Sequence, residues 1–380
     1  MPLVGDVVDA ALSVQPLVRE RAEACEDNLD LTVDVVDALV EAGLMRLCVP
    51  RAYDGPEATP MQLVEAVEAV AEADGAAGWC AMIASTTSSM SLFLPPPIAR
   101  EIYADPGVVT AGAFAPSGRA RTVDGGWSAT GRWAWGSATH HCQWVLGGCT
   151  TDTPLAADVE FHLMFVPAEH ATFHDNWDPI GLRGTGSGDF ELNDAFVPDG
   201  FSVRPGVTPP VVDSPLAHFP NFTLLAVAVA ATTLGIARHA VDEAVALAQV
   251  KTPMHASRRL GQSATAQIEL SRAEARLGAG RSFLLDAISA AWDDAVRGDR
   301  VTVEARARIR LAALHAVESA VAATDAAYTL AGGSAVARSH PLQRCLRDIH
   351  TATQHVMVSP RLHETIGRVL LGERVDTTML

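Results

Sequence analysis

The spacing of apolar residues changes twice along this chain, and the order of these patterns restricts the fold more than any other feature. Up to residue 106, apolar side chains recur at helical spacing, as at Leu31, Val35 and Leu39. Between 107 and 206, short runs rich in Gly, Trp, Thr and Val end in turn signals. After that, Ala and Leu again recur every three or four residues. The sequence therefore predicts an N-terminal α-helical domain (1–106), a β-sandwich or barrel domain (107–206) and a C-terminal four-helix bundle (207–380).

The middle region is predicted to be a small antiparallel β domain, because no helical segment alternates with its strands. Its strands are expected at Val109–Ala115, Trp127–Trp135, Gln143–Gly148 and Phe161–Val166. The bundle helices are expected at about 217–250, 262–297, 301–331 and 342–371, with Gly-rich or Pro-containing breaks between them. The fold class is thus mostly α with a central β domain.

Composition and charge exclude several functions. The 28 basic and 45 acidic residues leave a net charge of −17, which argues against nucleic acid or an anionic membrane surface as a partner. The apolar stretches 79–94 and 223–237 are short for a bilayer span, so we expect buried helices. With Asp6 and Asp9 where an export signal has basic residues, we expect a cytoplasmic protein. The six cysteines form no CxxC pair and no HExxH is present, so no metal site is predicted.

Tryptophan is concentrated in the β region. Trp127, Trp133, Trp135 and Trp144 fall within eighteen residues. Such rings either fill a β core or offer a flat face to a flavin or an aromatic substrate. The residues alone leave both interpretations open.

The sign of the charge inverts locally in residues 251–281, which carry a net +4 in a strongly acidic chain. Arginine side chains such as Arg258 and Arg259 suit the phosphate oxygens of an anionic cofactor. The alternative is a set of exposed helix charges that interact with acidic neighbours.

Four segments, in order along the chain, resemble signatures of the acyl-CoA dehydrogenase superfamily. They are Gly131–Ser137 continuing to His141–Trp144, Trp177–Ser187 followed by Ala195–Pro198, Leu330–Gly333, and Leu342–Asp348. The resemblance covers essentially the whole chain. It implies the three-part layout described above, a flavin cofactor and a homotetramer.

The resemblance leaves a choice between two kinds of enzyme. A dehydrogenase needs a carboxylate base, but the position where the family usually carries it aligns here with Ser339, and residues 244–268 contain neither Asp nor Glu. His340 is the remaining candidate base for an acyl-CoA dehydrogenase or oxidase. The other branch contains two-component monooxygenases, which take reduced FMN or FAD from a separate NAD(P)H:flavin reductase and use O2 to hydroxylate small aromatic molecules. The sequence favours this branch, and a flavin-free binding relative is a third hypothesis.

The resemblance also implies roles for individual residues. Ser137 is expected to position the flavin and His355 to act in the oxygen chemistry, although a β-turn hydroxyl and a buried helix histidine are the alternatives. The residues expected to bind the cofactor are Trp133, Trp135, Ser137, Arg183, Arg258, Arg259, Gly332 and Gly333. The residues expected to contact the substrate are His141 and Trp144.

Overall fold

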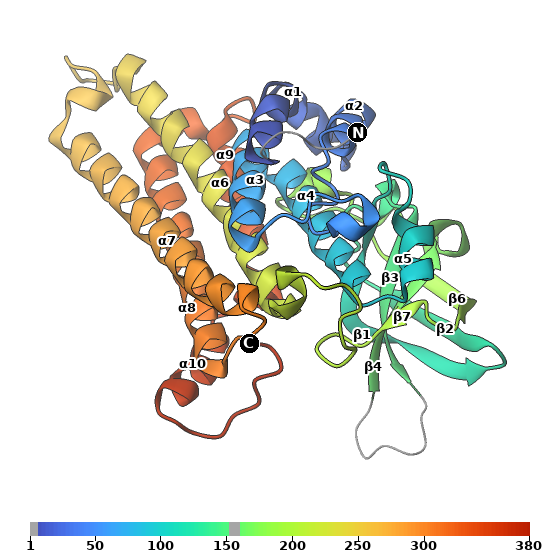
Figure 1. The fold of residues 1–380 in the computed structure, drawn as a ribbon. Coiled ribbons are helices and arrows are strands. Elements are labelled where there is room, and N and C mark those ends of the chain that lie inside the picture. The colour runs from blue at the N-terminus through green and yellow to red at the C-terminus, as the bar shows by residue number, and fades with distance from the viewer. Residues whose placement is uncertain (1–6, 152–159) are drawn as a thin grey trace.

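The computed structural model describes residues 7–151 and 160–380. Within these residues, five α-helices precede the sheet. They are α1 (Val7–Asn28), α2 (Val33–Glu41), α3 (Pro60–Ala73), α4 (Gly75–Ser88) and α5 (Pro96–Tyr103). Figure 1 shows α3 and α4 between the sheet and the long C-terminal helices. Asp74 ends α3 and begins α4, where its carboxylate accepts the backbone N–H of Ala77 at 3.0 Å. Almost every residue of α4 is buried, so this helix forms the centre of the N-terminal part.

The β region forms one seven-stranded sheet in the order β5-β6-β2-β1-β3-β4-β7. Its strands are β1 (Thr110–Val123), β2 (Gly126–Trp133), β3 (Trp144–Thr151), β4 (Glu160–Pro167), β5 (Thr172–Phe173), β6 (Phe190–Pro198) and β7 (Ser202–Val203). The prediction of a purely antiparallel domain is wrong for one pair, because β1 and β3 run parallel. β2 forms a hairpin with β1 on one side of it. Residues 134–143 then carry the chain past the beginning of β1, and β3 pairs with the other side of β1.

The C-terminal part contains α6 (Asn221–Val250), α7 (Ala264–Val296), α8 (Val303–Ala331), α9 (Pro341–Ala352) and α10 (Leu362–Leu370). By length and composition α6 could cross a membrane, but 94% of its most apolar window is buried inside the protein. The prediction that 223–237 lies in a buried helix is therefore confirmed. The sequence-based prediction of one helix over 342–371 is wrong: the helix stops after Ala352, and the short 3-10 turn Val356–Val358 separates α9 from α10. Pro360, which cannot continue an α-helix, follows that turn.

A buried group of charged side chains joins the parts. Arg347 of α9 donates to Glu26 of α1 at 2.6 Å, and Arg344 lies 3.6 Å from Asp74. Asp348 accepts the backbone N–H of Leu182 at 2.6 Å. Burial, reinforced by the nearby Asp74 carboxylate, raises the pKa of Asp348 to about 7. These contacts fix the turn 182–188 against α1, α4 and α9, and that turn carries part of the candidate site.

Candidate active site

Ser137 lies in a sharp turn directly after β2. Trp135 and Ala138, on either side of it, have positive φ values of 63° and 60°, a region that residues other than glycine rarely adopt. The turn is held by the N–H of Gly136, which donates to the carbonyl of Gly188 at 2.9 Å. Only 5% of Ser137 is exposed, and its Oγ accepts a hydrogen bond from the indole Nε1 of Trp79 at 3.0 Å. A helix residue thus fixes the hydroxyl of a strained turn.

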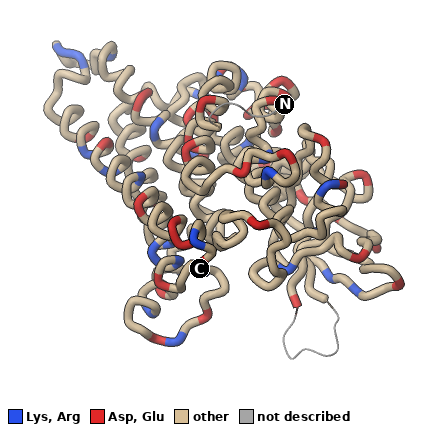
Figure 2. The backbone as a smooth tube through the Cα atoms, viewed as in Figure 1, with Lys and Arg blue, Asp and Glu red and all other residues tan. Residues whose placement is uncertain are grey.

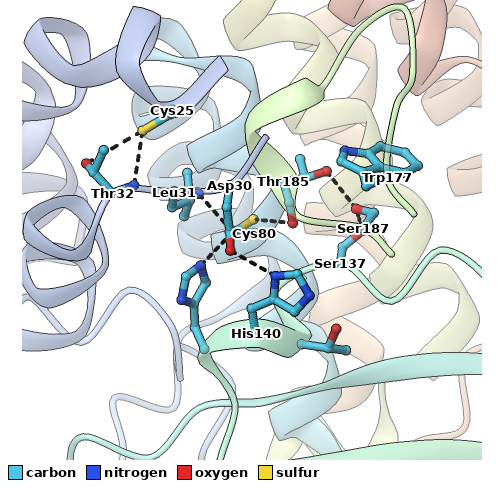
Figure 3. A network of polar contacts seen from close by, with 12 residues as sticks. Cys25, Asp30, Leu31, Thr32, Cys80, Ser137, His140, Trp177, Thr185 and Ser187 are labelled. Carbon is cyan, nitrogen blue, oxygen red and sulfur yellow. Dashed lines mark hydrogen bonds and ion pairs between the residues drawn. The ribbon is translucent and has the colours of Figure 1, made fainter. Parts of the chain in front are cut away.

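Three hydroxyl groups form a hydrogen-bonded chain that begins at Ser137 (Figure 3). Ser137 Oγ lies 2.7 Å from Ser187 Oγ, and Ser187 Oγ lies 2.6 Å from Thr185 Oγ1. Thr185 Oγ1 donates to the carbonyl of Leu182 at 2.8 Å. A hydroxyl has one proton, so when Thr185 donates to that carbonyl, Ser187 must donate to Thr185 and Ser137 to Ser187. In this arrangement Ser137 can offer a ligand only an acceptor lone pair.

His355 follows α9, where its half-buried ring packs edge-on against Trp79 with centroids 5.5 Å apart. Its Nδ1 accepts the backbone N–H of Met357 at 3.3 Å. Burial, and then the nearby charge of Arg310, lower the pKa of His355 to about 4. The ring is therefore neutral at physiological pH, and because Nδ1 is an acceptor, the proton lies on Nε2. His355 can thus donate one hydrogen bond from Nε2.

Trp79 of α4 contacts both Ser137 and His355 and is the residue that brings them together. The sequence analysis placed Trp79 only in a buried apolar helix. A buried indole needs a partner for its N–H, which is the one signal that could have indicated its role. We call Trp79, Ser137, Thr185, Ser187 and His355 the Ser137–His355 site.

His141, which was predicted to contact the substrate, is instead bound to a carboxylate. Its Nε2 lies 2.9 Å from Asp30, and His140 Nδ1 lies 2.9 Å from the other oxygen of the same side chain (Figure 3). Burial alone would raise the pKa of Asp30, but hydrogen bonds from the two histidines outweigh it and lower that pKa well below its usual range. The hydrogen bond that His140 donates to Asp30 raises the pKa of His140. The two histidines therefore join the α1–α2 connection to the turn that follows Ser137.

The tryptophans of the β region occupy different environments. The prediction that Trp133 contacts flavin is wrong, because Trp133 is fully buried, stacks on Phe190 at 4.9 Å and donates to the carbonyl of Gly148. The strands carry glycine against its ring: a Cβ at Gly118 would lie 2.2 Å from it. Trp144 stacks on Phe201 at 5.6 Å, and in residues 7–151 and 160–380 it forms no hydrogen bond or ring contact with the Ser137–His355 site. Trp135 is 73% exposed, so its ring is free to contact a ligand.

The arginines and glycines predicted to bind the cofactor separate into two places. Arg183 lies beside the Ser137–His355 site, on the turn that carries Thr185, but its guanidinium donates to Asp178 and to the carbonyl of Pro179. Arg258 and Arg259 are exposed in the connection 251–263 between α6 and α7, which we call the arginine loop. Figures 1 and 2 show this loop at the outer end of the long helices, away from the sheet.

Gly332 and Gly333 lie beside the arginine loop. The Nζ of Lys251, the first residue of the loop, donates to the carbonyl of Ala331 at 2.5 Å. The structure therefore brings Arg258, Arg259, Gly332 and Gly333 to one end of the bundle. It does not bring them to Ser137 or His355 within one chain.

Comparison with known proteins shows which family this chain is similar to. The model described as "Acyl-CoA dehydrogenase, N-terminal domain" matches residues 10–94, and "Acyl-CoA dehydrogenase, C-terminal domain" matches residues 227–360. The chain is 30% identical to an indole-3-acetate monooxygenase of Pseudomonas putida, over 94% of this chain and 92% of that protein. It is 29% identical to the flavin-dependent monooxygenase, oxygenase subunit HsaA, of Rhodococcus jostii, over 96% and 98% of the two chains. The structure of XiaF from a Streptomyces species, solved with FADH2 and glycerol, matches with a TM-score of 0.91 and 25% identity over 98% and 96% of the chains.

Proposed function

Because this chain belongs to the acyl-CoA dehydrogenase family, in its branch of flavin-dependent monooxygenases, we propose that it is the oxygenase component of a two-component system. It takes reduced FMN or FAD from a separate flavin reductase and uses O2 to hydroxylate a small aromatic molecule. The names of the relatives, which include a monooxygenase and an oxygenase subunit, support this reaction and the separate reductase. The FADH2 in the XiaF structure supports the reduced cofactor.

The observation that carries the proposal is the pair of hydrogen-bonding groups beside Trp79. Ser137 offers an acceptor and His355 Nε2 offers a donor, in a site where Ser137 is buried and His355 is half-buried. Reduced flavin carries an N–H at N5, whereas the N5 of oxidised flavin has no proton and can only accept. The hydroxyl chain therefore fits the reduced form. Reduced flavin supplies the two electrons that activate O2, and we assign His355 the role of donating a hydrogen bond to the oxygen.

The same region does not suit an acyl-CoA dehydrogenase. Ser339 is exposed in a turn before α9, and a serine cannot act as the base near neutral pH. His340 Nδ1 accepts the backbone N–H of Leu342 and so caps α9. Neither residue provides the carboxylate that removal of an α-proton from an acyl thioester requires.

The phosphate end of the flavin is assigned to Arg258, Arg259, Gly332 and Gly333 of a neighbouring chain in a homotetramer. Three observations support this assignment: the arginine loop is exposed, it carries basic side chains in an acidic protein, and it lies away from the Ser137–His355 site. We place the enzyme in the cytoplasm on the sequence features described above.

The test is oxygen incorporation. The purified protein is supplied with chemically reduced FMN or FAD under ¹⁸O2 and with a panel of phenols and indoles that includes indole-3-acetate. We expect one ¹⁸O atom in the product of at least one aromatic compound, and no bleaching of oxidised flavin by saturated acyl-CoA thioesters. Rapid bleaching without oxygen incorporation would contradict the proposal and favour a dehydrogenase with His340 as base.

A further inference from the structure

Arg310, in the first third of α8, has no exposed surface, and two of its three guanidinium nitrogens have no hydrogen-bond partner. Nη1 donates to the carbonyl of Phe222 at 3.1 Å and lies 3.6 Å from the Sδ of Met357. Nε and Nη2 are buried and make no hydrogen bond in residues 7–151 and 160–380. The hydrogens on Nε and Nη2 form the edge with which arginine binds a carboxylate through two parallel bonds. The edge left without a partner is therefore the one suited to a carboxylate.

Arg310 is also a buried charge without a counter-ion. Within the described part of the chain, no carboxylate lies within ion-pair distance of it, in contrast to Arg344 and Arg347 of α9. Burial lowers its pKa to about 10, so the side chain stays charged at neutral pH. A buried, unpaired charge with unmade hydrogen bonds destabilises a fold. An apolar side chain in its place would avoid this cost, so the arginine needs an explanation other than packing.

The first turn of α6 is a second feature that favours a bound anion. Arg310 is bound to Phe222 in that turn, and α6 begins without a side-chain cap on its backbone N–H groups. The Oγ1 of Thr223, the next residue, is likewise buried without a partner. A helix N-terminus attracts negative charge through its free N–H groups. The arginine edge, the uncapped turn and the threonine hydroxyl therefore all belong to one small region.

This region adjoins the Ser137–His355 site. Met357, which contacts Arg310, is two residues from His355, and the charge of Arg310 contributes to the lowered pKa of His355. His355 and Phe222 are both half-buried, so solvent reaches the layer of side chains that borders the residues in contact with Arg310. Phe222 packs edge-on against Phe114 at 6.4 Å, which gives this layer an aromatic lining. The unbranched side chain of Met357 can change rotamer to admit a ligand.

We propose that Arg310 binds the carboxylate of the substrate, so that the aromatic substrates of this enzyme are aromatic acids. The inference rests on the proposed function for the reaction and adds the chemical class of the substrate. The carboxylate occupies the Nε–Nη2 edge of Arg310, and the aromatic ring lies toward Phe222 and His355.

The experiment compares acids with their neutral amides. Calorimetry measures the binding of indole-3-acetate against indole-3-acetamide and of phenylacetate against phenylacetamide, first to the protein alone and then with reduced FMN in the absence of O2. For at least one pair we expect the acid to bind roughly tenfold or more tightly than the amide, because two charge-assisted hydrogen bonds form only with the acid. Equal affinity for acid and amide in both pairs, under both conditions, would overturn the inference.

Variants of Arg310 test whether this side chain causes the stronger binding of acids than of amides. Arg310→Met fills a similar volume and should abolish the difference between acid and amide, while Arg308→Met, on the exposed side of α8 beside Asp286, should leave it unchanged. If Arg310→Met does not fold, Arg310→Lys keeps the charge but not the two-bond edge and should reduce the preference to a few-fold. A preference that survives in the folded variant assigns the carboxylate to another group and refutes the role of Arg310.

These outcomes separate the inference from the proposed function. Oxygen incorporation into aromatic compounds with no preference for acids would support the monooxygenase reaction but refute the role of Arg310 in substrate binding. An Arg310-dependent preference for acids in a protein that incorporates no oxygen would support the carboxylate-binding site but refute the proposed reaction.

Discussion

The Ser137–His355 site and the arginine loop differ in how far a single chain completes them. In the site, Trp79 holds both Ser137 and His355, and every hydroxyl of the chain from Ser137 to Thr185 has a donor and an acceptor within the protein. In the arginine loop, Arg258 and Arg259 are exposed, and Arg259 makes its side-chain hydrogen bond to the backbone carbonyl of Gln249. The folding of one chain therefore fixes the reactive end of the site but leaves the loop open to a further partner.

This contrast bears on what each region contributes to stability. Loss of the buried Ser137 hydroxyl leaves the indole N–H of Trp79 without an acceptor and removes one of the two hydrogen bonds of Ser187, which costs about 1–3 kcal/mol. Loss of an exposed arginine costs little, because surface ion pairs contribute about 0–1 kcal/mol. Side chains of the loop can therefore be removed without unfolding the protein, which makes the comparison testable.

The largest effect is expected from the double variant Arg258→Ala/Arg259→Ala. If both arginines bind flavin phosphate, reduced flavin should bind roughly a hundredfold more weakly, since two charge-assisted hydrogen bonds are lost. The melting temperature of the flavin-free protein should not change, because both side chains are exposed. Anaerobic fluorescence titration measures the affinity, and Arg272→Ala, an exposed arginine of α7 beside Glu269, is the control. An unchanged affinity for reduced flavin would mean that the arginine loop is an ordinary charged surface and does not bind the flavin phosphate.

A mixing experiment tests whether the arginine loop of one chain serves the Ser137–His355 site of another chain. A chain with His355→Ala and a chain with Arg258→Ala/Arg259→Ala should each be nearly inactive alone. Coexpressed in equal amounts, they should restore about one quarter of the wild-type sites, because random association pairs an intact Ser137–His355 site with an intact loop in that proportion. No restoration in a verified mixed oligomer would mean that each chain uses its own loop.

A smaller effect is expected from His355→Ala within the site itself. Flavin binding should stay nearly unchanged, whereas product formed per flavin oxidised should fall at least tenfold, with H2O2 formed instead. The cause is loss of the Nε2–H donor beside Trp79. Product and H2O2 are quantified in parallel, and His350→Ala, an exposed histidine of α9 beside Asp325, serves as control. A wild-type product yield in this variant would mean that His355 only packs against its neighbours and takes no part in the oxygen chemistry.

The sequence predicts the fold well where apolar spacing repeats over many residues, and less well where a few polar contacts decide. The long helices α6, α7 and α8 fall close to their predicted ranges, because each repeats one pattern for some thirty residues. The break after Ala352 was missed because the residues that cause it, including His355 as a cap for Met357, act through local hydrogen bonds. A propensity pattern does not show such bonds.

The site could be predicted only in part, for a related reason. His355 and Ser137 were singled out through the resemblance to known enzymes, and the structure brings both to one tryptophan. Trp79 itself was missed because an apolar helix hides one polar atom among many apolar ones. Trp133 was overvalued because a tryptophan in a β core and one beside a ligand look the same in a sequence. The glycines at 118, 131 and 147, whose positions would each place a Cβ within 3 Å of its ring, mark it as a core residue only once the strands are paired.

The smallest effect is expected from Thr185→Val, which tests whether the hydroxyl chain sets the preference for reduced flavin. Valine keeps the shape of this buried residue but removes the proton donated to the Leu182 carbonyl and the acceptor used by Ser187. Ser187 can then donate to Ser137, and Ser137 can turn its own proton toward a ligand. The variant should therefore bind oxidised flavin roughly two- to tenfold more tightly relative to reduced flavin than wild type does, the effect of about one net hydrogen bond. Anaerobic titrations with oxidised and reduced FMN give this ratio, which general damage to the site would leave unchanged because it weakens both forms alike. Thr139→Val is the matched control, since this buried hydroxyl of the same turn donates to Gly136 and lies outside the chain. If the two variants give the same ratio as wild type, the direction of the hydroxyl chain does not govern which form of the flavin binds.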